Sequence, residues 1–249
     1  IRLGLAKRME VARRMSGGAL GMDNPDEKGA WASVGKMGRP ALSFVGDMGR
    51  MGLFLGPVLF YTFAPPLKMG RLLGRIHFIG FGSILVIVLT GGFTGMVLGF
   101  QGFNVLSRVG STAFLGPMVA LSLVRELGPV LAALMVTGRA GSAITAELGI
   151  MRNTEQIDEL EILGLSPYRY LVVPTFLAAL VSVPLLTAIF NVVGVMGGYL
   201  IGGKLLGVNA GTYFGAISDY MEAKDILGGL YKSVCFGGLI AWVCCFKGY

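Results

Sequence analysis

Long runs without a charged residue fill the second two thirds of the chain and determine its predicted architecture. Residues 76–107 carry no formal charge over 32 positions, and residues 170–203 carry none over 34. Two further apolar runs, at about residues 127–149 and 226–246, contain few charges. Because a helix needs about 20 apolar residues to cross the hydrocarbon core, we expect four transmembrane helices in an all-α, multi-pass membrane protein.

An earlier apolar stretch, residues 51–67, is also free of charge but is interrupted by prolines. It contains Pro57, Pro65 and Pro66 and is short for a hydrocarbon core of about 30 Å. We therefore expect an amphipathic helix lying in the membrane interface over residues 41–63, with a full span as the alternative.

Small residues recur at helical spacing within the apolar runs. Glycines repeat every four residues at Gly91, Gly95 and Gly99, and again at Gly194, Gly198 and Gly202. Such stripes lie on one helix face and allow another helix to approach closely. The pattern is equally compatible with packing inside one chain and with a seam between two copies.

Composition and charge agree with a membrane protein. The chain of 249 residues is 54% hydrophobic and 14% charged, whereas soluble domains carry about 25% charged residues. Residues 1–75 hold 12 Lys and Arg against 5 Asp and Glu, and the remainder is balanced. The positive-inside tendency predicts a cytoplasmic N-terminus, and we assign the basic excess to topology and lipid headgroups rather than nucleic acid. We expect residues 1–39 to form a basic cytoplasmic segment without a defined fold, preceding a membrane domain at 40–249.

A few charges interrupt the apolar runs. Arg125, Glu126, Arg139 and Glu147 fall in or beside the second run, and Lys232 lies six residues into the last one. Charges are costly in hydrocarbon, so those retained there usually face a cavity or a partner. For Lys232, reaching out to the interface is an equally good explanation.

An acidic stretch at residues 153–163 separates the second and third runs. We expect a short amphipathic helix, capped by Asn153 with Gln156 reaching back, and ended by Gly164 and Pro167. With the N-terminus inside, this helix is cytoplasmic. It is either a solvated loop helix or a docking element for a partner.

No motif of catalysis or metal binding accompanies these charges. The segment from Gly198 to Lys204 resembles a phosphate loop but continues with Leu205 and lies in a predicted span. The three cysteines lack metal-ligand spacing, so we predict no catalytic residue, no metal and no cofactor in this chain. A chain without an ATP site but with a docking helix suggests a permease driven by a separate subunit. The alternatives are a membrane enzyme using Arg125, Glu126 and Lys232, and an ion-coupled transporter, for which the expected internal repeat is not evident.

Three segments resemble one known family. The segment ALSLVRELGPVLAALMVTGRAGSAITAELGIMRNTEQIDELEILG is closely similar to the signature region of the MlaE-type permeases. The segments TGGFTGMVLGFQGF and PLLTAIFNVVGVMGGYLIG also resemble that family, and the likeness covers about residues 40–249. These permeases are the membrane subunits of ABC transporters that work with MCE proteins on phospholipids.

The resemblance implies a homodimer in the bacterial inner membrane that contributes to outer-membrane lipid homeostasis. It implies an ATPase subunit that carries ATP and Mg, an MCE lipid-binding protein and a small STAS-type cytoplasmic subunit as partners. Each permease of the family has an interfacial N-terminal helix, five transmembrane helices and a cytoplasmic coupling helix. Because this chain ends at Tyr249, before the position of the fifth span, we expect the last helix to be missing from it.

The resemblance also assigns two sets of residues. The lipid cavity is implied at the dimer interface, at the end of the first span and the start of the second, with Lys232 near it. Its residues are Leu98, Gln101, Leu106, Val109, Arg125, Glu126, Leu127 and Lys232. Contacts with the ATPase, or support of the coupling helix, are implied for Glu147, Arg152, Glu155, Asp158 and Glu159.

Overall fold

The structure, a computed structural model, describes residues 45–58, 60–62 and 69–249. It divides into two compact units, residues 1–50 and 51–249, and the second contains the membrane helices. Within the described ranges the regular elements are helices, and no strand occurs. The predicted all-α class is therefore confirmed, whereas the predicted basic segment 1–39 lies outside the described residues.

Four helical runs among the described residues are long and apolar enough to cross a membrane, as predicted. They are Met69–Arg108, Thr112–Asn153, Tyr168–Leu205 and Ala223–Gly248. The first run consists of α3 (Met69–Ile76), the π-helical η1 (His77–Phe81) and α4 (Gly82–Arg108). The third consists of η5 (Tyr168–Val172), α9 (Val173–Tyr199) and η6 (Leu200–Leu205), and the fourth is α11 (Ala223–Gly248).

The second span begins earlier than predicted. Instead of starting near residue 127, the helical run starts at Thr112 and continues to Asn153. Its segments are η2 (Thr112–Phe114), α5 (Leu115–Ser122), η3 (Leu123–Leu127), α6 (Gly128–Val136), η4 (Thr137–Gly141) and α7 (Ser142–Asn153). The π-helical η3 and η4 each sit where a charged residue enters the run, at Arg125 and Arg139.

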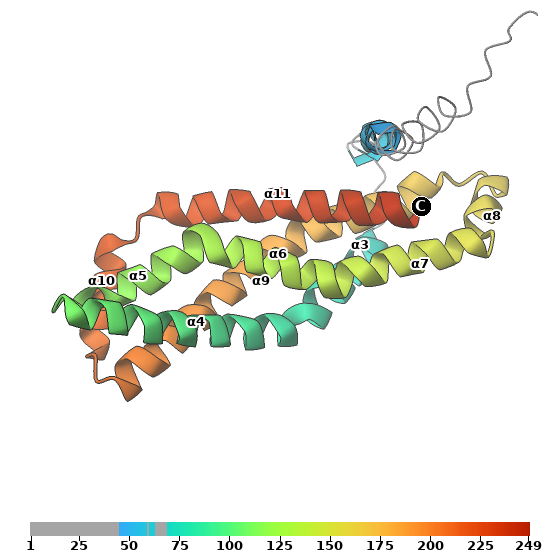
Figure 1. Ribbon diagram of the computed structural model, residues 1–249. Helices are drawn as coiled ribbons and strands as arrows, with labels where there is room; N and C mark the ends of the chain where they lie inside the picture. Colours follow the sequence, from blue (N-terminus) through green and yellow to red (C-terminus); the bar gives the residue numbers. More distant parts are fainter. Residues whose placement is uncertain (1–44, 59, 63–68) are drawn as a thin grey trace, which may run out of the picture. The chain divides into compact units, whose positions relative to one another are not determined.

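The bundle has two distinct ends. The short helix α8 (Gln156–Ile162) and the C-terminus lie at one end, and α10 (Ala210–Tyr220) and the α4–α5 turn lie at the other (Figure 1). We call these the α8 end and the distal end. The alternation of the four spans between them matches the predicted topology, which places both α8 and the C-terminus on one side.

Two glycine stripes meet each other along α4 and α9, the pair of helices with the most extensive contact. A Cβ atom at Gly95 would overlap the carbonyl oxygen of Gly194, and one at Gly99 would lie 2.8 Å from that of Gly198. Gly91 lies against Phe190 in the same row. We call this row of contacts the glycine seam. It shows that the stripes serve packing inside one chain, which resolves the choice left open by the sequence.

The fourth span packs against the second and third through small residues. Gly237 of α11 lies against the backbone of Ala179 in α9, and Gly141 of η4 lies against the Cys244 sulfur. The Thr145 hydroxyl donates to the Cys244 carbonyl oxygen at 3.2 Å. The contacts place α11 beside α7 and α9.

Tyr213 anchors α10 to the bundle. Its side chain is completely buried, and its hydroxyl donates to the Val195 carbonyl oxygen at 3.2 Å. Burial raises the pKa of this phenol above its usual range, so the group stays neutral and can donate this bond. The end of the glycine seam is close by, because a Cβ atom at Gly198 would lie 2.8 Å from the hydroxyl.

The segment predicted as an interfacial helix is helical at residues 45–58 and 60–62, and its predicted ends fall outside the described residues. Within the larger unit, the Trp242 indole donates to the Met51 carbonyl oxygen at 3.0 Å. The Phe54 ring lies 5.4 Å from the Tyr168 ring and 5.7 Å from the Phe246 ring, centroid to centroid. This part of the helix is therefore packed on the α8 end of the third and fourth spans.

The predicted cap of the acidic helix is wrong. Asn153 is the last residue of α7, and α8 begins at Gln156 after Glu155, which adopts a left-handed φ of 60° and makes no capping bond. The cause is that α7 continues further than expected, because the Thr154 amide and hydroxyl both donate to the Ile150 carbonyl oxygen. The predicted stop is correct: Gly164 has a φ of +74°, and the Leu165 amide returns to the Leu160 carbonyl oxygen.

Candidate functional site

Four charged side chains come together at the distal end, between η3 and α11. The Arg125 Nε donates to the Asp225 Oδ1 at 2.8 Å. The Lys232 Nζ donates to the Glu126 Oε1 at 2.7 Å and to the Arg125 carbonyl oxygen at 2.9 Å. We call these four residues the distal charged cluster. It has no net charge and joins the second span to the fourth.

Local structure explains why these residues meet. Gly229 allows α11 to approach η3, because a Cβ atom there would overlap the Val124 carbonyl oxygen. Asp225 and Lys232 are seven residues apart, so they project from the same face of α11. Asp225 also accepts a bond from the Glu222 amide within a capping box at the start of α11, which fixes its position.

The cluster is open rather than sealed. The exposed fraction of the side chain is 53% for Arg125, 43% for Lys232 and 70% for Glu126, and only Asp225 is nearly covered, at 11%. Exposed ion pairs contribute at most about 1 kcal/mol each to stability. Their atoms therefore remain available to other charged groups, such as a phosphate.

An apolar cavity of about 390 Å³ lies next to the cluster, between η3, α9, α10 and α11. Val124, Phe214 and Leu230 form part of its wall, together with Asn191 and Ser233. The Asn191 Oδ1 is buried and has no hydrogen-bond partner among the described residues. The cavity falls in the size range of small-molecule sites, about 300–1,000 Å³, and offers mostly hydrocarbon to an occupant.

The structure brings together only part of the predicted cavity set. Arg125, Glu126 and Lys232 meet, whereas Leu98 and Leu106 are half-buried along α4 and pack on the core. Leu127 is half-buried in the same way, and Gln101 and Val109 are exposed at the distal part of α4 and just beyond its end. The prediction missed Asp225, although its seven-residue spacing from Lys232 was a usable signal.

At the α8 end, the predicted coupling residues divide into two pairs and two exposed carboxylates. Arg152 donates to Asp158 at 3.0 Å, which ties α7 to α8. Glu147 instead accepts two bonds from Arg75 of α3, at 2.5 and 2.8 Å, and so links the first two spans. Glu155 and Glu159 are exposed, while the fully buried Ile157 anchors α8.

Tyr249 packs near Arg152 at the α8 end. Its ring lies 5.9 Å from the Arg152 guanidinium carbon. Burial raises the pKa of Tyr249 to about 12, so the phenol is neutral at physiological pH.

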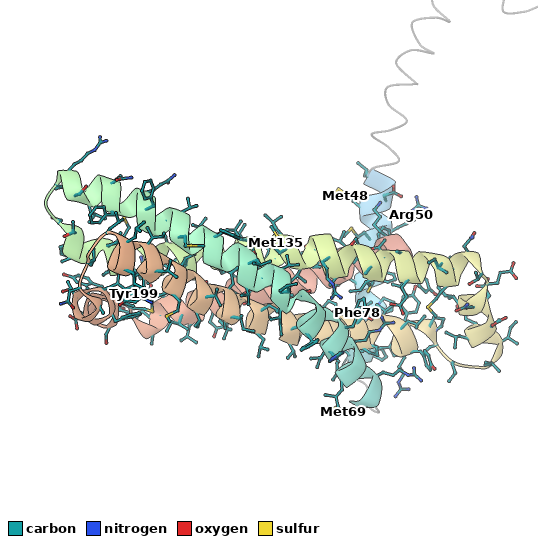
Figure 2. All side chains as sticks on the ribbon, turned by 90° about the horizontal axis from the view of Figure 1, so that it is seen from below. Met48, Arg50, Met69, Phe78, Met135 and Tyr199 are labelled. Carbon is teal, nitrogen blue, oxygen red and sulfur yellow. The ribbon has the colours of Figure 1, made fainter. Side chains whose placement is uncertain are left out.

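Contacts within the chain explain why Arg139 is tolerated in an apolar run, so neither a cavity nor a partner protein is needed for it. Its Nη1 donates to the Phe78 carbonyl oxygen at 2.6 Å, and its guanidinium lies over the Phe78 ring. It also covers Gly82, where a Cβ atom would overlap it. Figure 2 shows Phe78 at the bend between α3 and α4, within the π-helical η1.

The described residues contain no group of three His, Cys, Asp or Glu side chains able to hold a metal ion. The segment from Gly198 to Lys204 is helical, in α9 and η6, and so does not form a phosphate-binding loop. The arrangement as a whole offers charge recognition beside a hydrocarbon cavity.

Comparison with known proteins gives consistent matches. Residues 72–249 match the family described as Permease MlaE. The chain is 39% identical over 217 residues to the intermembrane phospholipid transport system permease protein MlaE of Haemophilus influenzae, covering 87% of this chain and 83% of that one. It is 39% identical over 213 residues to a probable ABC transporter permease protein of Rickettsia felis, covering 86% and 82%. It is also 34% identical over 163 residues to the chloroplastic protein TRIGALACTOSYLDIACYLGLYCEROL 1 of Arabidopsis thaliana, covering 66% and 47%.

Proposed function

The chain belongs to the MlaE permease family, and on that basis we propose that it is the membrane subunit of an ABC transporter of phospholipids. It lies in the bacterial inner membrane as a homodimer with its N-terminus in the cytoplasm. The observation that carries the proposal is the distal charged cluster beside an apolar cavity, at the opposite end of the bundle from α8. The names of the relatives favour transport over a lipid-modifying enzyme.

The distal charged cluster has the chemistry to handle a phospholipid. Arg125 and Lys232 offer cations to the phosphate, and Glu126 offers an anion to an amine-bearing headgroup. Apolar walls hold acyl chains with about 0.8 kcal/mol per buried methylene. Because both members of the Lys232–Glu126 pair are exposed, a headgroup replaces one charged partner with another there at little cost.

The α8 end has the features of a coupling site. Glu155, Asp158 and Glu159 give α8 an acidic surface, and the Arg152–Asp158 pair holds α8 to α7. We propose that a separate ATPase subunit, which carries ATP and Mg, docks on this surface. Movement of α8 then passes along the continuous second span, through α7, η4 and α6, to the distal charged cluster. An MCE lipid-binding protein receives or delivers the lipid at the distal end, and a small STAS-type subunit accompanies the ATPase.

Co-purification tests the assembly. The tagged chain, extracted in mild detergent, should retain an ATPase subunit, an MCE protein and phospholipid, each identified by mass spectrometry. Recovery of the chain alone, even after crosslinking, would overturn the proposal.

Charge reversal tests the docking surface. Glu155→Lys combined with Asp158→Lys should release the ATPase while the permease remains folded, and the matched control is Asp219→Lys in α10 at the distal end. Unchanged co-purification of the ATPase with the double variant would place the docking surface elsewhere.

A further inference from the structure

A second apolar hollow lies on a different face of the bundle from the distal charged cluster. It is a groove of about 430 Å³ between α4 and α9. Gly92 and Gly197 form its floor, because a Cβ atom at Gly197 would overlap the Gly92 carbonyl oxygen. The side chains that rise on either side are largely apolar and exposed, among them Leu89, Phe93, Met196 and Leu200.

One cation stands at the mouth of this groove. Lys204 is the only charged residue that lines it, and its side chain is exposed. Among the described residues no carboxylate pairs with Lys204, in contrast to Lys232 of the distal charged cluster. Lys204 precedes the last residue of the third span, Leu205, which puts its ammonium at the level of lipid headgroups. Figure 2 shows Tyr199, which also lines the groove, near the distal end of α9.

On its α9 side the groove is about as long as one leaflet, and on its α4 side its lining begins deeper, at Val88. Val193 and Lys204 are eleven residues apart, which is about 16 Å along a helix. Half of a hydrocarbon core of about 30 Å is about 15 Å. An acyl chain that begins beside Lys204 and follows the groove therefore reaches the middle of the membrane without leaving hydrocarbon.

The groove adjoins the apolar cavity beside the distal charged cluster at Met196, which lines both, but it opens between α4 and α9 and contains no residue of that cluster. On the unbroken helix α4, Leu98 and Gln101 are turned from Gly92 by roughly 120° and 180° at 3.6 residues per turn. These two α4 residues of the lipid cavity implied by the family resemblance thus point away from the groove, whereas Leu106, a third, is turned by only about 40° and lies further towards the distal end of α4. A lipid in the groove would touch neither Gln101 nor the distal charged cluster.

We propose that the groove between α4 and α9 binds one acyl chain of a phospholipid in the distal leaflet, with the Lys204 ammonium contacting the lipid phosphate. The occupant is a phospholipid because the groove pairs an apolar channel one leaflet long with a single unpaired cation. A free phosphate would satisfy Lys204 but leave the channel unexplained. The bound lipid covers the floor where α4 and α9 touch and is not a transported molecule.

Photolabelling in a bilayer tests this site. The chain, with its ATPase subunit, is placed in nanodiscs containing a phospholipid with a diazirine near the end of one acyl chain, and the labelled peptides are identified by mass spectrometry. We expect labels on the peptide that contains Phe93 and Met96, which line the groove but not the cavity beside the distal charged cluster. A matched probe without phosphate, a diazirine diacylglycerol, should label it several-fold less.

Two substitutions address the floor and the mouth separately. Gly92→Leu fills the groove, since a Cβ atom there meets only Val193 at 3.6 Å, and it should lower labelling at least fivefold. Gly138→Leu is the matched control, because a Cβ atom there meets nothing within 4 Å and Gly138 lies away from the groove.

Lys204→Gln should lower labelling about threefold, while Lys204→Arg should retain it. If Gly92→Leu fails to elute as a folded complex, the Lys204 pair still decides the result.

Several results would overturn the proposal. Equal labelling by the phospholipid and the diacylglycerol would show that Lys204 does not contact the lipid phosphate. Unchanged labelling in Gly92→Leu would show that the acyl chain does not lie in the groove. Competition by millimolar inorganic phosphate would indicate a free-anion site. Crosslinks between two copies through cysteines placed at Phe93, with no lipid label, would show that a second copy covers this face.

Discussion

The glycine seam and the distal charged cluster both join distant parts of the chain, but they do so by opposite means. In the seam, Gly95 and Gly194 bring two backbones into contact without any side chain between them. In the cluster, Arg125 and Lys232 reach across to carboxylates on a neighbouring helix and remain exposed. The seam cannot accept another atom, whereas the cluster can exchange its partners. Stability and charge recognition are thus placed in different contacts.

The physical reason lies in the solvent. Lipid tails are as apolar as the helix surfaces, so burial of hydrocarbon does little to hold two spans together in a membrane. Close backbone approach increases dispersion contacts, and glycine permits the closest approach. Exposed ion pairs contribute about 0.2–1 kcal/mol and can be exchanged for a ligand with little loss.

The largest effect is expected in the seam. Gly95→Val should destabilise the protein by about 3 kcal/mol, because its Cβ atom meets the Gly194 carbonyl oxygen and forces α4 and α9 apart. Thermal unfolding in detergent, followed by the loss of the monodisperse peak, measures the change. Gly138→Val, where the new atoms meet open space, should be far milder; equal losses in both would refute the role of the seam.

A smaller effect is expected at Asp225, which belongs both to the distal charged cluster and to the capping box of α11. Asp225→Ala removes both the partner of Arg125 and one half of the capping box of α11, and should cost about 1–2 kcal/mol. Urea or SDS titration monitored by circular dichroism gives the difference. Glu222→Ala keeps the Arg125–Asp225 pair and removes the other half of the capping box, together with the exposed pair to Lys224. An equal loss in both variants would show that the Arg125–Asp225 pair contributes nothing.

Tyr213 allows hydrogen bonding to be separated from packing at the distal end of the seam. Tyr213→Phe deletes the bond to the Val195 carbonyl oxygen but keeps the ring, and should cost about 1 kcal/mol. The same unfolding titration applies. Tyr220→Phe on the same helix, whose ring is half-exposed, is the control, and a loss near 3 kcal/mol would mean that packing also changed.

The smallest effect on stability, and the largest on function, is expected at Lys232. Lys232→Met removes an exposed pair and should change the free energy of unfolding by about 0.5 kcal/mol or less. Transfer of fluorescent phospholipid between proteoliposomes and the MCE partner should nevertheless fall about tenfold. Lys224→Met, at an exposed pair next to the cluster, should leave transfer unchanged. A stable variant with full transfer would show that Lys232 has no role in lipid transport.

The first and third spans were predictable because runs free of charge over more than 30 residues are typical of transmembrane helices. The start of the second span was not predictable from the apolar pattern, because Pro117 and Pro129 each disfavour a continuous helix. Both prolines lie in the first turns of α5 and α6, where a missing amide hydrogen costs little, and the π-helical η3 joins the two segments. Sequence spacing does not reveal where a π-helical turn will occur.

Part of the site was predictable for a similar reason. Arg125, Glu126 and Lys232 stand out as charges in apolar runs, and the spacing of Asp225 could have added the fourth. The pair of Arg75 with Glu147 joins residues 72 apart, and only the arrangement of the first two spans in space brings them together. In the same way, both glycine stripes were evident, but their mutual contact depends on the relative placement of two helices.

Arg139 also bears on how the chain enters a membrane during synthesis. An arginine within a span opposes release into lipid when the helix is alone, by up to about 2.5–3.5 kcal/mol at the helix centre. Its acceptor, the Phe78 carbonyl oxygen, belongs to the preceding span and has already left the ribosome when Arg139 is made. We therefore expect the first two spans to leave the translocon together as a hairpin, in which the Phe78 carbonyl oxygen of the first span already accepts a hydrogen bond from Arg139 of the second.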